Sequence, residues 1–300
     1  MRATLLSLLF AGGCLASFGQ DAAPGTPIPD KGQCLLTEQP ESAPVGAQPR
    51  GTAAACAPAT ALRNLEWNNV RALVENGGSL WYNRSIDKGA YIVPKEAGVS
   101  VVYGGALWLA GISPDQQLKL AAARYRNNGN DFWPGPLTND GAAEVDEATC
   151  SAYDKFSITE RQDAMRHRQY FDCAADPTCD LDTEFPEGYA IPTSFFDYPA
   201  HGNVALQQDY YPAPFYGYDG DGNYDPTLGD YPWYDFLQEI DCGNRRREDR
   251  VPLYGDQTYY WIFNDKGNVH TESLGEPIGM EIRAQSFAFS TNDEINNMTF

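Results

Sequence analysis

The chain has 300 residues, of which 42% are hydrophobic and 13% aromatic, enough for one large or two small packed domains. Its 41 acidic and 21 basic residues give a formal charge of −20, which argues against nucleic acid and anionic membrane surfaces as partners. Twenty-eight glycines and twenty-one prolines indicate many turns and favour β structure over helical bundles.

Residues 1–19 have the pattern of a signal peptide. Arg2 supplies a positive start, an apolar stretch follows from Leu5 to about Phe18, and the small residues Ser17 and Gly19 have the spacing of a cleavage site. We therefore expect export to the cell surface or the medium. No later stretch approaches the roughly 18 apolar residues of a membrane span, so we expect a protein that does not cross the membrane.

The cysteines predict disulfides. Of seven, Cys14 leaves with the signal peptide, and six remain: Cys34, Cys56, Cys150, Cys173, Cys179 and Cys242. An even number in an exported chain favours disulfide pairing over metal binding. Sequence cannot select the pairing, but short loops favour Cys34 with Cys56 and two bridges among the later four.

Residues 20–62 are rich in proline, alanine and glycine and predict a flexible lead-in, followed by a β-rich domain over residues 63–300. Val70–Val74 and Ser79–Tyr82, separated by the turn residues Asn76-Gly77-Gly78, predict a hairpin. A short strand follows at Tyr91–Val93 and ends at a proline.

The stretch Val99–Ala110 predicts a strong strand with apolar residues on both faces, so we expect both faces to be covered. A turn at Ser113-Pro114-Asp115 returns the chain as a second strand over Leu118–Tyr125. Phe132 and Trp133 then lie in a proline-rich loop. We expect them to pack over the core, with a ligand-binding edge as the alternative.

One helix is predicted over Thr159–Phe171, with Thr159 as its N-cap and a thin apolar face that places it at the surface. Residues 181–234 read as loops. Thr258–Phe263 predicts a strand, and Gly279–Thr291 predicts another with a bulge near Gln285. Residues 296–300 look like the opening of a further strand, so we expect this chain to be the front piece of a longer polypeptide.

The acidic stretch from Tyr216 to Tyr234 predicts a calcium site. Oxygen-bearing side chains occur at alternate positions and again eleven residues after the first: Asp219, Asp221, Asn223, Asp225 and Asp230. Gly220 and Gly222 allow tight turns between them, and Ca²⁺ accepts six to eight such oxygens. Two features differ from an EF-hand, because Tyr224 stands where glycine is required and flanking prolines exclude helices. The alternative is a solvated acidic turn without metal.

Together these patterns predict a mainly β fold of sandwich-like antiparallel sheets, with long loops stabilised by calcium and disulfides and one short surface helix. Aromatic residues near the acidic loops could stack on sugar rings, and the candidates are Trp133, Tyr231, Trp233 and Tyr234. Core packing explains the same aromatic residues equally well.

Seven phrases carry a resemblance to a known group of proteins. They are ALWLAG (106–111), LKLAAARYR (118–126), NDFWPGPL (130–137), DGDGNYDP (219–226), GDYP (229–232), FNDKGNVHTE (263–272) and FAFSTNDEINNMTF (287–300). In this order they resemble the N-terminal region of large secreted or cell-surface proteins of the Bacteroidota. Those proteins typically end in a type IX secretion sorting domain, which is absent from these 300 residues, so that export route is implied by the resemblance alone.

The sequence favours a secreted or cell-surface calcium-binding module for adhesion, with glycans or other surface proteins as partners. The alternative is an extracellular hydrolase that uses paired carboxylates, as glycosidases do. No nucleophile elbow, metalloprotease or phosphate-loop motif occurs, and no catalytic residue is assigned. Asp293 and Glu294 are the first candidates for such paired carboxylates, although a polar turn between two strands explains them more simply.

Overall fold

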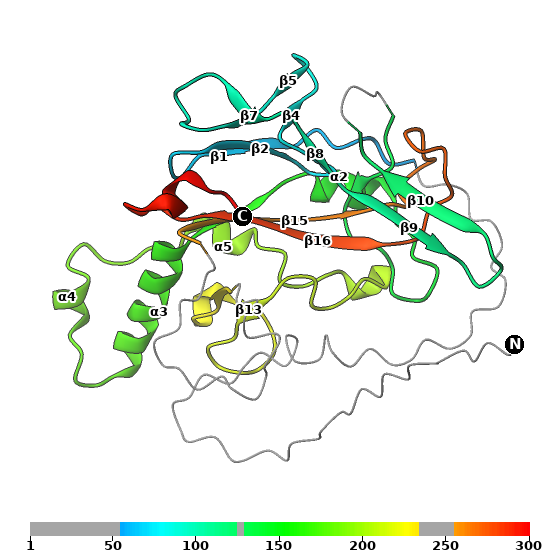
Figure 1. Ribbon diagram of the computed structural model, residues 1–300. Helices are drawn as coiled ribbons and strands as arrows, with labels where there is room; N and C mark the ends of the chain where they lie inside the picture. The colour runs from blue at the N-terminus through cyan, green and yellow to red at the C-terminus, as the bar shows by residue number, and fades with distance from the viewer. Residues whose placement is uncertain (1–54, 125–128, 234–254) are drawn as a thin grey trace, which may run out of the picture.

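The computed structural model describes residues 55–124, 129–233 and 255–300. Its organising element is β15 (Gln257–Asn264), in which every residue after Gln257 is buried. Figure 1 shows β1 (Leu62–Leu65) and β2 (Arg71–Glu75) on one side of this strand, and α5 (Thr193–Phe196) and β13 (Phe215–Tyr216) on the other. Because side chains alternate between the two faces of a strand, β15 contributes to two separate cores.

The central sheet is antiparallel and surrounds β15. On one edge β15 pairs with β16 (Glu281–Ala288), and on the other with β11 (Trp133–Pro134) and β12 (Ser157–Glu160). The eight pairs with β16 run without interruption from Gln257↔Ala288 to Asn264↔Glu281. The predicted bulge near Gln285 is therefore wrong. No bulge is needed, because both faces of this sheet are covered and residues of either parity find a core.

A second antiparallel sheet packs on one face of the central sheet and confirms the sandwich-like expectation. Its strand order is β7-β6-β2-β3-β8, with β1 also paired to β2. The remaining bounds are β3 (Ser79–Leu80), β6 (Tyr91–Ile92), β7 (Ser100–Val102) and β8 (Gly105–Ala106), while β4 (Tyr82–Asn83) pairs with β5 (Lys88–Gly89). Pairing of Val74 with Leu80 confirms the predicted hairpin at the Asn-Gly-Gly turn.

The space between these two sheets is filled by what we call the sheet core. Its buried members are Leu65, Val74, Ala121, Ala123, Phe132, Tyr259, Trp261, Phe263 and Ala288. Phe132 and Phe263 meet edge to face with ring centroids 5.6 Å apart, an arrangement that aromatic pairs prefer. The prediction that Phe132 packs into the core is confirmed, since only 2% of it is exposed.

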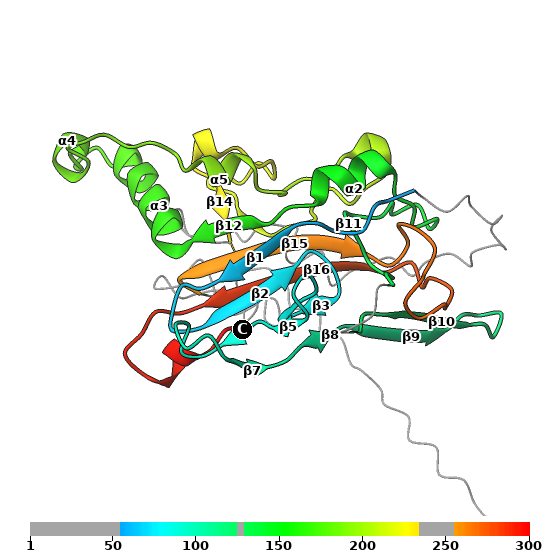
Figure 2. The ribbon, with the colours of Figure 1, turned by 90° about the horizontal axis from the view of Figure 1, so that it is seen from above.

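The stretch 99–110 differs from its prediction in two ways. It is divided among β7, β8 and β9 (Trp108–Ile112), and β9 forms a separate two-stranded ribbon with β10 (Leu118–Ala122). Val101 and Trp108 are 60% and 66% exposed, so the expectation that both faces are covered is wrong. Val101 is exposed because it lies in β7, an edge strand of the second sheet. Trp108 is exposed because the β9–β10 ribbon projects beyond the two main sheets, which leaves one of its faces in solvent (Figure 2).

On the opposite face of the central sheet, helices and short irregular segments enclose what we call the tyrosine core. Its buried members are Ala164, Phe195, Tyr198, Ala200, Ala213, Phe215, Tyr216, Tyr231, Trp233, Tyr260 and Ile262. The helices are α2 (Glu147–Tyr153), α3 (Arg161–Ala175), α4 (Leu181–Glu184) and α5 (Thr193–Phe196), with short 3-10 turns η1 (Val204–Leu206) and η2 (Pro226–Leu228). More helix is therefore present than the single surface helix expected.

Helix α3 begins two residues later than predicted. Thr159 belongs to β12, where it pairs with Thr258, and the residue before the helix is Glu160. Pairing of Ser157–Glu160 with the central strand is the tertiary contact that overrides the local capping signal. His167 in this helix is fully buried, because α3 packs against the tyrosine core and does not lie free on the surface.

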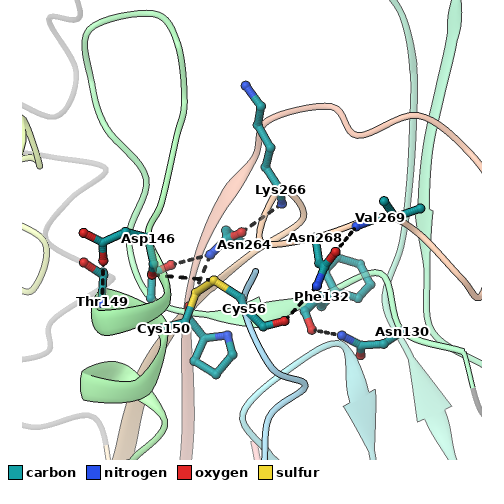
Figure 3. Close-up of a disulfide and its surroundings, with 12 residues drawn as sticks. Cys56, Asn130, Phe132, Asp146, Thr149, Cys150, Asn264, Lys266, Asn268 and Val269 are labelled. Carbon is teal, nitrogen blue, oxygen red and sulfur yellow. Dashed lines mark hydrogen bonds between the residues drawn. A yellow bond between two sulfur atoms is a disulfide. The ribbon is translucent and has the colours of Figure 1, made fainter. Parts of the chain in front are cut away.

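Two disulfides join described residues, Cys56–Cys150 and Cys173–Cys179. The predicted pairing of Cys34 with Cys56 is wrong, because the backbone N–H of Cys56 donates to Gly267 and this contact brings Cys56 beside α2. Figure 3 shows that Asn268 also donates to the Cys56 carbonyl oxygen, at 3.1 Å. Cys56 therefore pairs with Cys150, which is close in the folded chain although it lies 94 residues away in the sequence. Cys34 and Cys242 lie outside the described residues, as does the predicted signal peptide.

Residues 294–300 turn back onto the edge of β16. Glu294–Asn297 form the 3-10 turn η3, and Phe300 then exchanges two backbone hydrogen bonds with Phe287, at 2.7 and 2.9 Å. Their rings stack with centroids 5.3 Å apart. Residues 296–300 therefore form no strand of their own, and only Phe300 pairs with β16 as a further strand would.

Candidate calcium-binding loop and a neighbouring groove

The acidic loop lies between β13 (Phe215–Tyr216) and β14 (Tyr231–Pro232), which pair antiparallel and bring its two ends together. Gly220 and Gly222 adopt positive φ angles of 72° and 82°, where a side chain would be strained. Their presence explains how so short a segment can turn repeatedly. The predicted ligands therefore do lie in one compact loop.

Most of these side chains bind the backbone of their own loop. Asp219 accepts a hydrogen bond from the N–H of Asp221, at 3.0 Å, and Asp221 accepts one from the N–H of Asn223, at 2.7 Å. Asp225 in the same way accepts from Thr227 and begins η2. These are the local turns that Asp and Asn favour without any metal, as the alternative interpretation expects.

Asp230 is different, because it is buried beneath the loop with 1% of its surface exposed. One carboxylate oxygen accepts from the N–H of Tyr218 and the other from the N–H of Asp225, both at 2.7 Å. Burial raises the pKa of Asp230 to about 6, the two backbone donors oppose that rise, and the charges of Asp219 and Asp221 add to it. The loop thus holds a buried carboxylate whose negative charge is disfavoured by its surroundings.

The donor chemistry of the loop fits a hard cation. Carboxylate, amide and backbone oxygens are the ligands that Ca²⁺ takes, and a cation near Asp219, Asp221 and Asp230 would replace repulsion among them by attraction. In the part of the chain that the structure describes, no three His, Cys, Asp or Glu side chains are gathered closely enough to hold a metal. Binding would therefore require the exposed side chains of Asp219 and Asp221 to turn from their backbone partners.

The aromatic residues predicted to face a ligand are buried. Trp133, Tyr231 and Trp233 are 2%, 1% and 6% exposed, so they offer no surface on which a sugar ring could stack. Tyr231 stacks on Tyr216 within the tyrosine core, at a centroid distance of 4.9 Å. The core-packing interpretation therefore holds for these three, whereas Tyr234 lies outside the described residues.

A groove of about 430 Å³ contains functional candidates that sequence reasoning missed. Its walls come from the turn after β1, from α3 and from one end of the β15–β16 pair, where β15 begins and β16 ends. The lining residues are Trp67, Arg161, Gln162, Met165, Arg166, Gln169, Asp256 and Ser290. Figure 2 shows the start of α3 beside the start of β15, where these segments meet. An indole, two guanidinium groups and two amides are thus brought together.

The floor of the groove is held by a small network around Asp256. Its carboxylate pairs with the guanidinium of Arg161 and accepts a hydrogen bond from the N–H of Ser290, at 2.7 Å. The N–H of Arg161 also donates to the Asp256 carbonyl oxygen, at 2.9 Å. Because backbone and side-chain contacts act together, the first turn of α3 is fixed to the central sheet.

Part of this groove has a signal in the sequence. Gln162, Met165, Arg166 and Gln169 are spaced by three and four residues, which places them on one face of a helix. No local pattern connects them with Trp67 or Asp256, because those residues lie almost a hundred positions away on either side. Only the folded chain brings the three segments together.

Of the two acids considered for a hydrolase, Asp293 has a structural role. Asp293 accepts hydrogen bonds from the hydroxyl of Thr291 and from the N–H of Ile295, so it caps η3. Its pKa is lowered, first by the Thr291 hydroxyl and then by the backbone of Ile295. An ionised cap of this kind agrees with the polar-turn interpretation.

Comparison with known proteins gives no relative. No family model matches the chain, and neither a curated protein nor a solved structure is similar to it. Within the described ranges, no helix combines the length and the apolar character that crossing a membrane requires. Inferences about function therefore depend on the residues of this chain.

Proposed function

We propose that this chain is a secreted or cell-surface β-rich module that binds Ca²⁺ through Asp219, Asp221, Asn223, Asp225 and Asp230. Its role would be adhesion, through binding of glycans or other surface components. The observation that carries the calcium site is Asp230, a buried carboxylate next to two further acidic side chains. A divalent cation is the partner that would stabilise its ionised form.

Several features support an extracellular location. The predicted signal peptide, the disulfides Cys56–Cys150 and Cys173–Cys179, and the charge of −20 all suit a protein outside the cell. Extracellular modules bind calcium with dissociation constants of about 0.1 to 1 mM, so millimolar calcium would occupy such a site. The resemblance to surface proteins of the Bacteroidota agrees with this setting.

Thermal unfolding with and without calcium tests the proposal. Since the ion would bind the folded form, calcium at about 100 times its dissociation constant should add about 2.7 kcal/mol to the free energy of unfolding. Asp221→Ala should lose most of this gain. Asp221 is exposed and its interactions lie within the loop, so the variant should still fold.

Asp115→Ala is the matched control, because Asp115 is also an exposed acidic residue in a turn but belongs to the β9–β10 ribbon. It should retain the full calcium response. If the parent protein melts at the same temperature in calcium and in chelator, the loop is an acidic turn and the calcium proposal fails.

A further inference from the structure

The groove beside α3 is locally cationic in an acidic protein. Arg161 is neutralised by Asp256, whereas Arg166 is exposed and makes no ion pair with any carboxylate among the described residues. The guanidinium of Arg166 lies over the ring of Phe185, 4.7 Å from its centroid. This contact orients the side chain while leaving its N–H groups free to donate, because the ring occupies only the flat face of the guanidinium.

A single arginine can attract an anion here despite the charge of −20. At physiological ionic strength the Debye length is about 8 Å, so acidic groups elsewhere on the surface are largely screened at the groove. The charged groups that line the groove are two arginines and one aspartate. The planar guanidinium matches a carboxylate best, because two parallel N–H donors meet two oxygens.

The other walls of the groove suit a sugar ring. Trp67 is 37% exposed and Met165 is 54% exposed, and they offer an apolar surface for the C–H face of a pyranose. Gln162 and Gln169, on the same face of α3, supply amide groups that can both donate to and accept from hydroxyls. A volume of about 430 Å³ lies within the range of ligand sites on proteins.

We propose that this groove binds a carboxylate-bearing saccharide, with its ring against Trp67 and its carboxylate at Arg166. The inference rests on the proposed adhesive function and deepens it, since it specifies an acidic glycan as the ligand. Asp256 acts as a positioning residue, because it holds Arg161 and the start of α3 in place.

Isothermal titration with a short oligogalacturonate, and with the same oligomer after methyl esterification of its carboxyl groups, tests this assignment. The acid should bind and the ester should bind at least about tenfold more weakly. Arg166→Gln should weaken binding of the acid by about 10- to 100-fold and leave binding of the ester unchanged. Trp67→Ala should weaken both oligomers by about tenfold.

Two variants serve as matched controls. Lys88→Gln removes an exposed positive charge on β5, and Trp108→Ala removes an exposed indole on β9, both outside the groove. Neither should change binding. Because Arg166 is exposed, Arg166→Gln should keep the melting temperature of the parent, which separates lost recognition from lost folding.

Three results would overturn the proposal. Equal affinity for acid and ester would show that the carboxylate is not recognised. Equal effects of Arg166→Gln and Lys88→Gln would show that the saccharide does not bind in the groove. Binding of neither oligomer, by a protein that still melts higher in calcium, would remove the acidic-glycan site and leave the calcium loop intact.

Discussion

The two faces of β15 are covered by different kinds of structure. The sheet core lies between regular antiparallel strands, and its large members are mostly Phe, Trp and aliphatic residues. The tyrosine core lies beneath short helices and irregular segments, and four of its buried members are tyrosines: Tyr198, Tyr216, Tyr231 and Tyr260. The two faces of one strand are therefore buried in different ways, one by paired strands and the other by helices and irregular segments.

The difference lies in how backbone carbonyl groups find hydrogen-bond donors. Around the sheet core, neighbouring strands supply most of them, and one phenol hydroxyl, that of Tyr259, donates to the carbonyl of Asn64 at 3.0 Å. In the tyrosine core, phenol hydroxyls do so, since Tyr260 donates to the carbonyl of Pro212 and Tyr198 to that of Pro214, both at 2.5 Å. Tyr224 donates similarly to Phe195, at 2.9 Å. An irregular segment can thus be buried against a sheet if aromatic residues carry a donor at the tip.

The largest expected loss of stability comes from removing one aromatic ring from each core. Phe263→Ala in the sheet core should cost about 3–5 kcal/mol, because paired strands on both sides cannot collapse into the cavity. Phe215→Ala in the tyrosine core should cost less, since the irregular segments around it can move inward. Urea unfolding of both variants measures the difference. Equal costs would show that the two cores are equally rigid.

The second prediction is that the free energy of unfolding falls by about 3 kcal/mol at low pH, because of His167 at the edge of the tyrosine core. Burial lowers the pKa of His167 from its ordinary value of 6.5 to about 4, and hydrogen bonds with the backbone of Gly229 and Asp230 oppose this change only in part. Between these values the unfolded chain binds more protons than the folded one, so stability is complete above about pH 6.5 and falls as the pH drops towards 4.

Urea unfolding at several pH values between about 7 and 4 checks this expectation. His167→Phe should flatten the dependence, although it also loses the hydrogen bond between His167 and the hydroxyl of Tyr189. A parent protein whose stability does not change over this range would contradict the assignment of a buried neutral imidazole.

The smallest expected loss of stability comes from removing a single hydroxyl group. Tyr260→Phe keeps the ring but removes the donor to Pro212, and should cost about 1–3 kcal/mol because a buried carbonyl loses its partner. Tyr103→Phe is the control, since the Tyr103 hydroxyl bonds Asp87 at a site where Tyr103 is 42% exposed, so water can take over the hydrogen bond. Similar costs for the two variants would show that the hydroxyls do not hold the tyrosine core together.

Elements decided by neighbouring residues could be predicted from the sequence. The Asn-Gly-Gly turn gives the β2–β3 hairpin, and the turn at 113–115 gives the β9–β10 ribbon. Features decided by distant residues could not. Exposure of Trp108 depends on which other sheet covers it, and the partner of Cys56 depends on its contact with Gly267. Alternating apolar residues indicate a strand, but they do not show which of its faces another sheet covers.

The same distinction applies to the candidate sites. The acidic loop is continuous in sequence, so its residues could be listed in advance, including the buried Asp230. Burial of Trp133, Tyr231 and Trp233 could not be foreseen, because an aromatic residue beside a loop suits either a core or a ligand. The groove was missed for the opposite reason, since Trp67, α3 and Asp256 meet only after folding.

The position of β15 in the chain has a consequence for the order in which the protein can fold. Residues 257–264 are made after β1 to β12 and after nearly all of the tyrosine core, yet both cores need this strand. Until it has been synthesised, the earlier elements have no central sheet on which to pack. The two cores therefore cannot close until most of the chain has been made, and the central sheet is complete only after β16, at residue 288.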